Sequence, residues 1–224
     1  MDTPRSRPPD AGWLQEVGDR VRTWWLAKLL GIVGGMLAFF IVYFWLLRHP
    51  FFPVTVMPLT EVDRMIGFFP AALPLYLSLW LYVSLGPALL IDRRELLSYA
   101  LATGVLGVIG LGIFFISPTT VPRPEVDWSQ HAAFAFLKSV DASGNACPSL
   151  HVAFAVFTAI WLAHLGRQIG VGRVVRLLNW LWCAGILYST VAVRQHVALD
   201  VFAGAALGAA VAAVHLRWLR VSVI

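Results

Sequence analysis

Long apolar segments alternate along the chain with short charged or proline-containing connections. A membrane-spanning helix needs about 20 predominantly apolar residues to cross the hydrocarbon core. Six segments reach or approach that length, and they cover roughly residues 28–47, 66–91, 96–117, 150–166, 177–194 and 197–216. This pattern predicts an all-α integral membrane protein folded as a six-transmembrane-helix bundle.

Two of the predicted spans contain residues that bear on their packing. Pro70, Pro74 and Pro87 predict bends in the second span, which neighbouring helices can accommodate within a membrane. Gly204 and Gly208 lie one helical turn apart in the alanine-rich last span. Small residues at this spacing let two helix backbones approach closely, so this face is expected to pack against another helix.

The composition agrees with a membrane protein. The 224 residues are 59% hydrophobic and 13% charged, whereas a soluble domain is about half apolar and about one quarter charged. The net charge of +5 would also suit a nucleic-acid-binding protein, but the arginines lie between apolar spans and indicate membrane orientation. Cys147 and Cys183 lack the spacing of a disulfide framework or a metal site. We expect membrane lipids as partners, with no nucleic acid, and the sequence does not indicate an oligomeric state.

The polar N-terminal segment differs from the rest of the chain. We expect residues 1–27 to form a cytoplasmic leader and residues 28–220 to form the six-span domain. Within the leader, an interfacial helix is predicted from Trp13 to Leu26. Trp24 and Trp25 are expected at the depth of the lipid headgroups, where tryptophan is enriched.

The distribution of cations predicts how the bundle is oriented. Five of the 17 Lys and Arg residues fall on the side opposite the termini, and these are Arg48, Arg64, Arg123, Lys138 and Arg194. The remaining twelve share the side of both termini. The positive-inside rule places that side in the cytoplasm, so the loops before the fourth and last spans are expected to face outward. We expect the membrane to be a prokaryotic plasma membrane.

The long outer connection, residues 118–149, has a pattern of its own. Within residues 129–140, Ala133, Phe136, Leu137 and Val140 follow the spacing of one helix face. This spacing predicts a short amphipathic helix lying on the outer leaflet. Such a helix would either form one wall of a lipid entrance or cover the end of the bundle.

His196 and Asp200 are four residues apart at the start of the last predicted span. Residues at this spacing share a helix face, so the carboxylate can accept the Nδ1 proton of the imidazole and leave Nε2 free as a nucleophile. An aspartate within an apolar span is unfavourable unless it has a partner or faces water, which makes the pair a candidate functional site. A structural hydrogen bond between helices would explain the same spacing.

His151 lies at the start of the fourth predicted span, directly after Pro148 and Ser149. Proline suits the first turn of a helix, and Ser149 can cap the free amide groups there, where anions are attracted. His151 would then face the same pocket and could donate a proton to a leaving oxygen. A packed or interfacial histidine is the alternative interpretation.

Two arginines are candidates for binding a phosphate. Arg123 stands between two prolines after the third span, and Arg194 lies two residues before His196. A guanidinium group matches phosphate with two parallel hydrogen bonds. Each arginine alone would more often anchor in lipid headgroups. Their occurrence with the histidines on one leaflet favours the phosphate interpretation.

These residues form parts of three motifs. Pro148-Ser149-Leu150-His151 fits the pattern Pro-Ser-x-His. Ser189-Thr190 with His196 and Asp200 fits part of Ser-Arg-x5-His-x3-Asp, with threonine in the place of the arginine.

The third pattern is Lys-x6-Arg-Pro, which is matched by Arg123-Pro124 with Ile116 in the place of the lysine. Together the motifs resemble the type 2 phosphatidic acid phosphatase superfamily of integral membrane enzymes. The segment that starts at Cys147 and the Gln195-His196 segment look most like the branch containing inositol phosphorylceramide synthase, an inositolphosphotransferase. Arg194 would then replace the missing arginine.

The resemblance implies a function and a role for each residue. His196 would attack a lipid-linked phosphorus to give a phosphohistidine, Asp200 would orient it, and His151 would protonate the leaving group. Arg123, Arg194 and Ser149 would hold the phosphoryl oxygens. Members of this superfamily need no metal, and no cofactor is expected. The acceptor is either water, as in a phosphatase, or a second lipid, as in a transferase.

Two other classes of function remain open at this stage. Histidines on helices of a six-span bundle can ligate haem iron, although His164 and His215 form no obvious second pair. A lipid transporter or scramblase would use His196 and Asp200 as a relay, but it would also place charged residues deeper in the bundle, where few occur.

Overall fold

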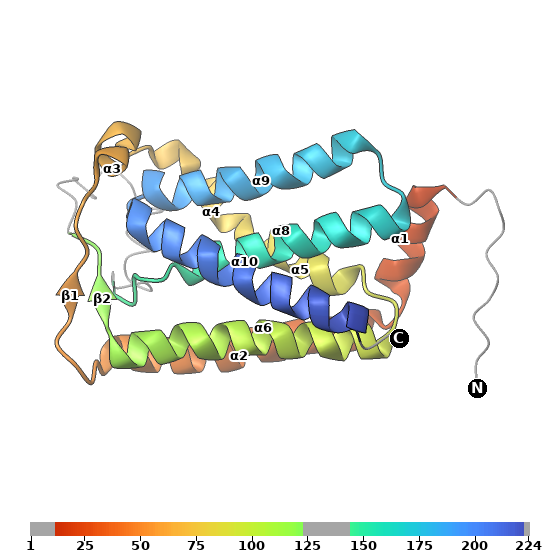
Figure 1. Ribbon diagram of the computed structural model, residues 1–224, viewed down its shortest axis with the longest axis horizontal. Coiled ribbons are helices and arrows are strands. Elements are labelled where there is room, and N and C mark those ends of the chain that lie inside the picture. Colours follow the sequence, from red (N-terminus) through yellow and green to blue (C-terminus); the bar gives the residue numbers. More distant parts are fainter. Residues whose placement is uncertain (1–11, 123–143, 222–224) are drawn as a thin grey trace.

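The computed structural model describes residues 12–122 and 144–221, which form an elongated bundle of helices (Figure 1). In chain order its elements are α1 (Trp13–Arg22), α2 (Trp25–Arg48), β1 (Thr55–Val56), α3 (Glu61–Ile66), η1 (Pro70–Ala72), α4 (Leu73–Leu77), α5 (Leu79–Ala88), α6 (Arg93–Ile116), β2 (Thr119–Thr120), α8 (Leu150–Ile169), α9 (Arg173–Ala192) and α10 (Ala198–Val221).

Six helical segments of the described chain are long and apolar enough to cross a membrane, which confirms the predicted six-span, all-α architecture. The second span, Pro70–Ala88, is broken into η1, α4 and α5. Pro70 and Pro74 lie in the first turns of η1 and α4, and Pro87 lies inside α5. The span is therefore interrupted close to Pro70 and Pro74, whereas α5 continues through Pro87, and the bend predicted at Pro87 stays a prediction.

Helix α8 is the central element of the bundle, with α10, α9 and α5 packed around it. The closest approach is made by α10 through the predicted glycine face. A Cβ atom on Gly204 would lie 2.2 Å from the carbonyl oxygen of Ser149, and one on Gly208 would lie 2.2 Å from that of Ala153. Any larger residue would collide with the backbone of α8, so the predicted packing role of these glycines is confirmed.

The N-terminal helix α1 lies at the end of the bundle where α10 ends (Figure 1). Buried Lys28 holds it there, because its Nζ donates to the carbonyl oxygens of Arg20 at 2.6 Å and Ala88 at 2.8 Å. Arg20 also donates from Nη1 to the carbonyl oxygen of Leu89 at 3.1 Å. A helix thus exists within the predicted interfacial segment, and the division between residues 27 and 28 stays a prediction.

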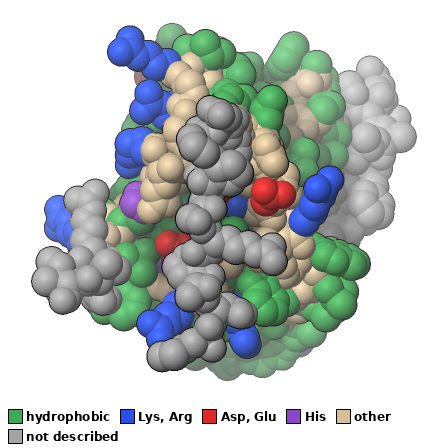
Figure 2. Space-filling view, turned by 90° about the vertical axis from the view of Figure 1, so that its right-hand side faces the viewer, with side chains coloured by type: hydrophobic (Ala, Val, Ile, Leu, Met, Phe, Trp, Pro, Cys, Tyr) green, Lys and Arg blue, Asp and Glu red, His purple; other side chains and the backbone are tan. Residues whose placement is uncertain are grey.

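Basic side chains gather around this end of the molecule, which Figure 2 views directly. Arg20 and Arg22 lie in the last turn of α1, Arg93 begins α6, Arg167 lies in the last turn of α8, and Arg173 begins α9. The motif residues His151, His196 and Asp200 lie at the opposite end, where α8 and α10 begin.

A small pair of strands at the opposite end was not expected from the sequence. Strands β1 and β2 are parallel, with Thr55 opposite Thr119. Thr119 also supports the segment that leads into α8, since its carbonyl oxygen accepts from the amide of Ala146 at 3.2 Å and its Oγ1 accepts from the amide of Cys147 at 2.8 Å. The amphipathic helix predicted within residues 129–140 lies outside the described residues.

Candidate active site

His196 and Asp200 lie on either side of the start of α10. His196 belongs to the connection from α9, and Asp200 lies in the first turn of α10, so the pair spans the helix start rather than one helix face. His196 Nδ1 is 3.5 Å from Asp200 Oδ2, and the side chains are 11% and 0% exposed. This distance is within ion-pair range but longer than an ordinary hydrogen bond. The predicted His–Asp pair is therefore assembled, with room to tighten.

Backbone hydrogen bonds fix the connection that carries His196. The amides of Gln195 and His196 both donate to the carbonyl oxygen of Thr190 at 3.1 Å, and the amide of Val197 donates to Asp200 Oδ2 at 3.0 Å. Arg194 has a φ of 59°, in the left-handed region that non-glycine residues rarely adopt. This turn places the imidazole of His196 near the start of α8, with its ring centroid 6.3 Å from that of His151.

His151 occupies the first turn of α8 and is enclosed by aromatic rings. Its ring stacks on Tyr76 with centroids 4.3 Å apart and planes 13° from parallel, and Trp80 meets it edge-on at 5.5 Å. Among the described residues, its buried Nε2 atom has no hydrogen-bond partner, and neither has Asp200 Oδ1. Buried polar atoms are normally paired, so these two atoms are candidates for contact with a ligand.

Ser149 joins the two histidine-bearing segments. It is the N-cap of α8, where its Oγ accepts from the amide of Val152 at 3.3 Å. Its own amide donates to the carbonyl oxygen of Asp200 at 3.0 Å. The hydroxyl thus already serves as a helix cap, and its predicted contact with a phosphate stays a prediction.

Of the two predicted phosphate-binding arginines, the structure describes only Arg194. Arg194 Nη1 donates to the carbonyl oxygen of Asp63 at 3.1 Å, so part of its guanidinium is already used within the protein. Arg123 lies outside the described residues. The structure therefore brings together His151, His196, Asp200 and Ser149.

Three side chains of this end of the bundle were not found from the sequence. They are Tyr76 and Trp80, which contact His151, and the fully buried Asp63. Thr60 and Asp63 have the spacing of a helix-start signal, which could have located α3. No short-range pattern, however, shows that the carboxylate of Asp63 reaches another helix.

Cys147 lies half-buried beside the site, outside the spans. Burial and, to a smaller extent, the charge of Asp200 raise the pKa of its thiol above the usual range. The thiol is therefore protonated at neutral pH, and a protonated thiol is a poor nucleophile. Cys147 is therefore a weak candidate for a nucleophile in this site. Within the described residues, no group of three or more His, Cys, Asp or Glu side chains is placed to hold a metal ion.

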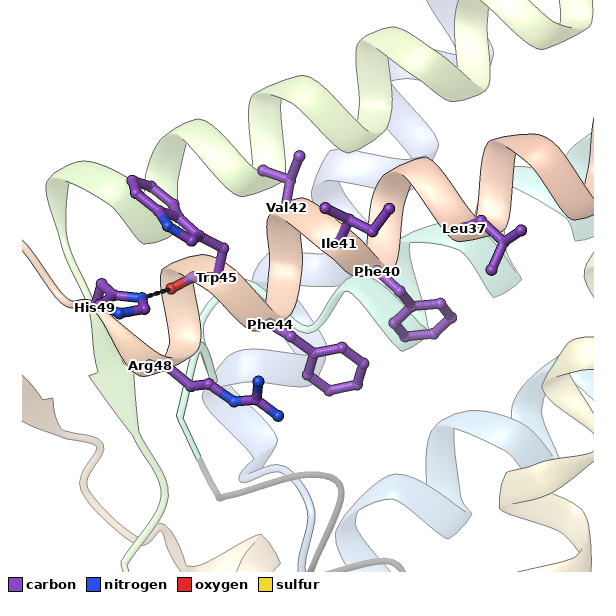
Figure 3. A pocket seen from close by; sticks show the side chains of 8 residues that line it. All are labelled: Leu37, Phe40, Ile41, Val42, Phe44, Trp45, Arg48 and His49. Carbon is purple, nitrogen blue, oxygen red and sulfur yellow. Dashed lines mark hydrogen bonds between the residues drawn. The ribbon is translucent and has the colours of Figure 1, made fainter.

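An open groove on the surface of α2 runs along its outer half next to this aromatic cluster, and the described residues that line it all belong to this helix and its C-cap. Its lining residues are Leu37, Phe40, Ile41, Val42, Phe44, Trp45, Arg48 and His49. Phe40, Phe44 and Arg48 point to the same side of the helix (Figure 3), and the Arg48 guanidinium lies 5.9 Å from the centre of the Phe44 ring. Phe40 packs against Trp80 at 5.3 Å, so the groove is connected to His151 through a single indole ring.

These features define the class of protein: an integral membrane protein of six helical spans with a His–His–Asp cluster at one end. The family model of the PAP2 superfamily, the type 2 phosphatidic acid phosphatases, matches residues 95–223, which is more than half of the chain. The chain belongs to this superfamily, which supports a phosphatase-type activity on lipid phosphates. No curated protein and no solved structure matches the chain. The matched segment contains every predicted site residue, whereas Asp63 lies before it.

Proposed function

We propose that this protein cleaves or transfers the phosphoryl group of a lipid phosphate through a phosphohistidine formed on His196. The observation that carries this proposal is the convergence of His196, Asp200 and His151 from two different helices. The imidazole centroids lie 6.3 Å apart, which supports a single phosphoryl group within reach of both rings. A nucleophile approaches to about 3–3.5 Å and a proton donor to about 2.6–3.2 Å of the reacting atoms.

The reaction proceeds in two steps: His151 gives a proton to the leaving alcohol in the first and takes one from the acceptor hydroxyl in the second. Nε2 of neutral His196 attacks phosphorus, the P–O bond to the leaving alcohol breaks, and protonated His151 gives that oxygen its proton. Asp200, next to Nδ1, orients the imidazole and stabilises the charge on the phosphohistidine. An acceptor hydroxyl then gives its proton to His151 and attacks phosphorus, and the P–N bond breaks to restore His196. Arg123 and Arg194 hold the phosphoryl oxygens.

The lipid part of the substrate is proposed to lie along the groove of α2. Its wall is apolar along Leu37, Phe40 and Phe44 and ends in the exposed cation Arg48. This arrangement suits an acyl or prenyl chain that carries an anionic headgroup, and Trp80 separates it from His151. The basic side chains at the opposite end of the bundle favour a cytoplasmic location of that end, so the reaction would occur at the extracytoplasmic face.

The acceptor is either water or the hydroxyl group of a second lipid. The resemblance of the segments around Cys147 and Gln195 to the inositol phosphorylceramide synthase branch favours transfer, and the superfamily as a whole includes hydrolysis. Both outcomes use the same phosphohistidine and differ only in which hydroxyl group reaches it.

Purified protein in detergent is expected to release phosphate from at least one lipid phosphate in the presence of EDTA. The substrates to compare are phosphatidic acid, a prenyl diphosphate and phosphatidylglycerol phosphate, with a His196→Ala variant as the background. Phosphate release would establish a phosphatase. A new phospholipid, formed only when an inositol phospholipid and an acceptor lipid are supplied together, would establish a transferase. Activity that EDTA removes, or that the variant retains in full, would contradict the mechanism.

A further inference from the structure

The carboxylate of Asp63 connects α3 to the start of α10. Asp63 is fully buried, and its Oδ1 accepts from the amide of Ala198 at 2.7 Å. Its Oδ2 accepts from both the amide and the Oγ1 of Thr60, each at 2.7 Å. A carboxylate with three such donors is held in one position, and it holds its donors in turn.

Ala198 is the first residue of α10, and the first amides of a helix have no partner within the helix. One such donor, Val197 just before the helix, is satisfied locally by Asp200, whereas Ala198 is satisfied by Asp63 from far earlier in the chain. A negative charge at a helix N-terminus is also favourable because the helix dipole is positive there. Asp63 therefore acts as a cap for α10 that is supplied by another element.

The same residue also holds the other side of the His196 turn. The carbonyl oxygen of Asp63 accepts from Arg194 Nη1 at 3.1 Å. Arg194 stands two residues before His196, and Ala198 stands two residues after it. The segment that carries the proposed nucleophile is thus attached to Asp63 on both sides.

Contacts just before the His196 turn also attach the end of α9 to the segment that follows α3. The amide of Phe69 donates to the carbonyl oxygen of Ala192 at 2.8 Å, and Val193 shares a buried apolar cluster with Leu73 and Tyr76. Tyr76 is the ring on which His151 stacks. The α3–α4 region therefore holds the turn that carries His196 through Asp63 and contacts His151 through Tyr76.

We propose that Asp63 is a positioning residue of this site: it caps α10 and secures Arg194, and it thereby places His196 for attack on the phosphoryl group. This inference rests on the proposed function and adds to it a residue outside the segment that matches the superfamily. A displacement of about 1 Å at a reacting group can reduce the rate about 100-fold, so loss of this attachment is expected to act on kcat.

Asp63→Asn tests the inference with little change in shape. The amide group of asparagine presents a donor in place of one carboxylate oxygen, so it faces either the amide of Ala198 or that of Thr60 without accepting from it. We expect kcat for phosphate release to fall roughly 10- to 100-fold and KM to change less than about threefold. Hydrogen–deuterium exchange at Ala198 should become faster in the same preparation.

Glu61→Gln is the matched control, because Glu61 is on the same short helix, carries the same charge, and pairs with its exposed neighbour Arg64 alone among the described residues. It should leave kcat, KM and exchange unchanged. Asp63→Ala removes all three acceptor contacts. It should therefore lower kcat further than Asp63→Asn does, and it should make exchange at Ala198 faster still. Both quantities are measured on the monodisperse folded fraction, so partial unfolding does not imitate the result.

Three outcomes would overturn the inference: unchanged exchange at Ala198 in Asp63→Ala, faster exchange with unchanged kcat, or a rise in KM with kcat retained. Failure of the proposed function is seen separately, as absence of both phosphate release and phospholipid transfer by the unaltered protein with every substrate. In that case exchange at Ala198 still decides whether Asp63 holds the turn, and unchanged exchange rejects the attachment itself.

Discussion

Replacing His196 with asparagine is expected to lower phosphate release at least about 1000-fold and to abolish any covalent phosphoryl-protein intermediate. Asparagine keeps a polar side chain of similar reach but has no nitrogen lone pair that can attack phosphorus. Acid-quench trapping of the protein with a ³²P-labelled lipid phosphate measures the intermediate directly. The turn should stay intact, because its hydrogen bonds to Thr190 come from the backbone.

His164→Asn is the matched control for this experiment. His164 is near the other end of α8, where its Nε2 lies 3.1 Å from Gln168 Nε2, and it is remote from the proposed chemistry. This variant should retain both turnover and labelling. Labelling that persists at full level in the His196 variant would show that the phosphoryl group is carried elsewhere.

The role of His151 predicts a different kinetic pattern from that of His196. If His151 acts as the acid, a His151→Asn variant should still form the phosphohistidine from an aryl phosphate, whose leaving group needs little protonation. Pre-steady-state kinetics should then show a burst of about one aryl alcohol per protein followed by slow turnover. If the unaltered protein shows a burst and the His151→Asn variant shows none, His151 would be assigned to substrate binding instead.

The membrane architecture could be predicted because it depends on properties of single segments. Length and apolar composition determine whether a helix can span the hydrocarbon core, and neither requires knowledge of the neighbours. The glycine face of α10 was also predictable, since Gly204 and Gly208 have a spacing whose main use is close helix packing. The paired strands β1 and β2 could not be predicted, because each has only two residues and its partner is remote in sequence.

The candidate site could be predicted only as far as local spacing reaches. The i, i+4 relation of His196 and Asp200 identified the pair, and the motif at Ser149 and His151 identified the helix start opposite it. Asp63 was missed because its partners, Ala198 and Arg194, are set by tertiary structure alone. For the same reason, nothing in the sequence showed that Ser149 would be occupied as a cap or that His151 would stack on Tyr76.

The contact between α8 and α10 sets the distance between the two halves of the site. Ser149 and His151 belong to the start of α8, while His196 and Asp200 belong to the start of α10. The helices approach so closely only because Gly204 has no side chain, as its Cβ position lies 2.2 Å from the carbonyl oxygen of Ser149. A methyl group at this position would force the helices apart beside the hydrogen bond from Ser149 to Asp200.

Gly204→Ala is therefore expected to destabilise the folded protein by about 1–3 kcal/mol and to reduce kcat of the folded fraction roughly 100-fold. Gly208→Ala creates a clash of the same size against Ala153, one turn farther from the site. It should lower the stability by a similar amount with a smaller loss of kcat. Gly112→Ala on α6, where a Cβ atom meets nothing within 4 Å, should leave kcat unchanged and should not lower the stability. Thermal unfolding in detergent and kcat per folded protein separate the two effects. An equal loss of kcat in Gly204→Ala and Gly208→Ala would contradict the idea that Gly204 sets the distance between the two helix starts.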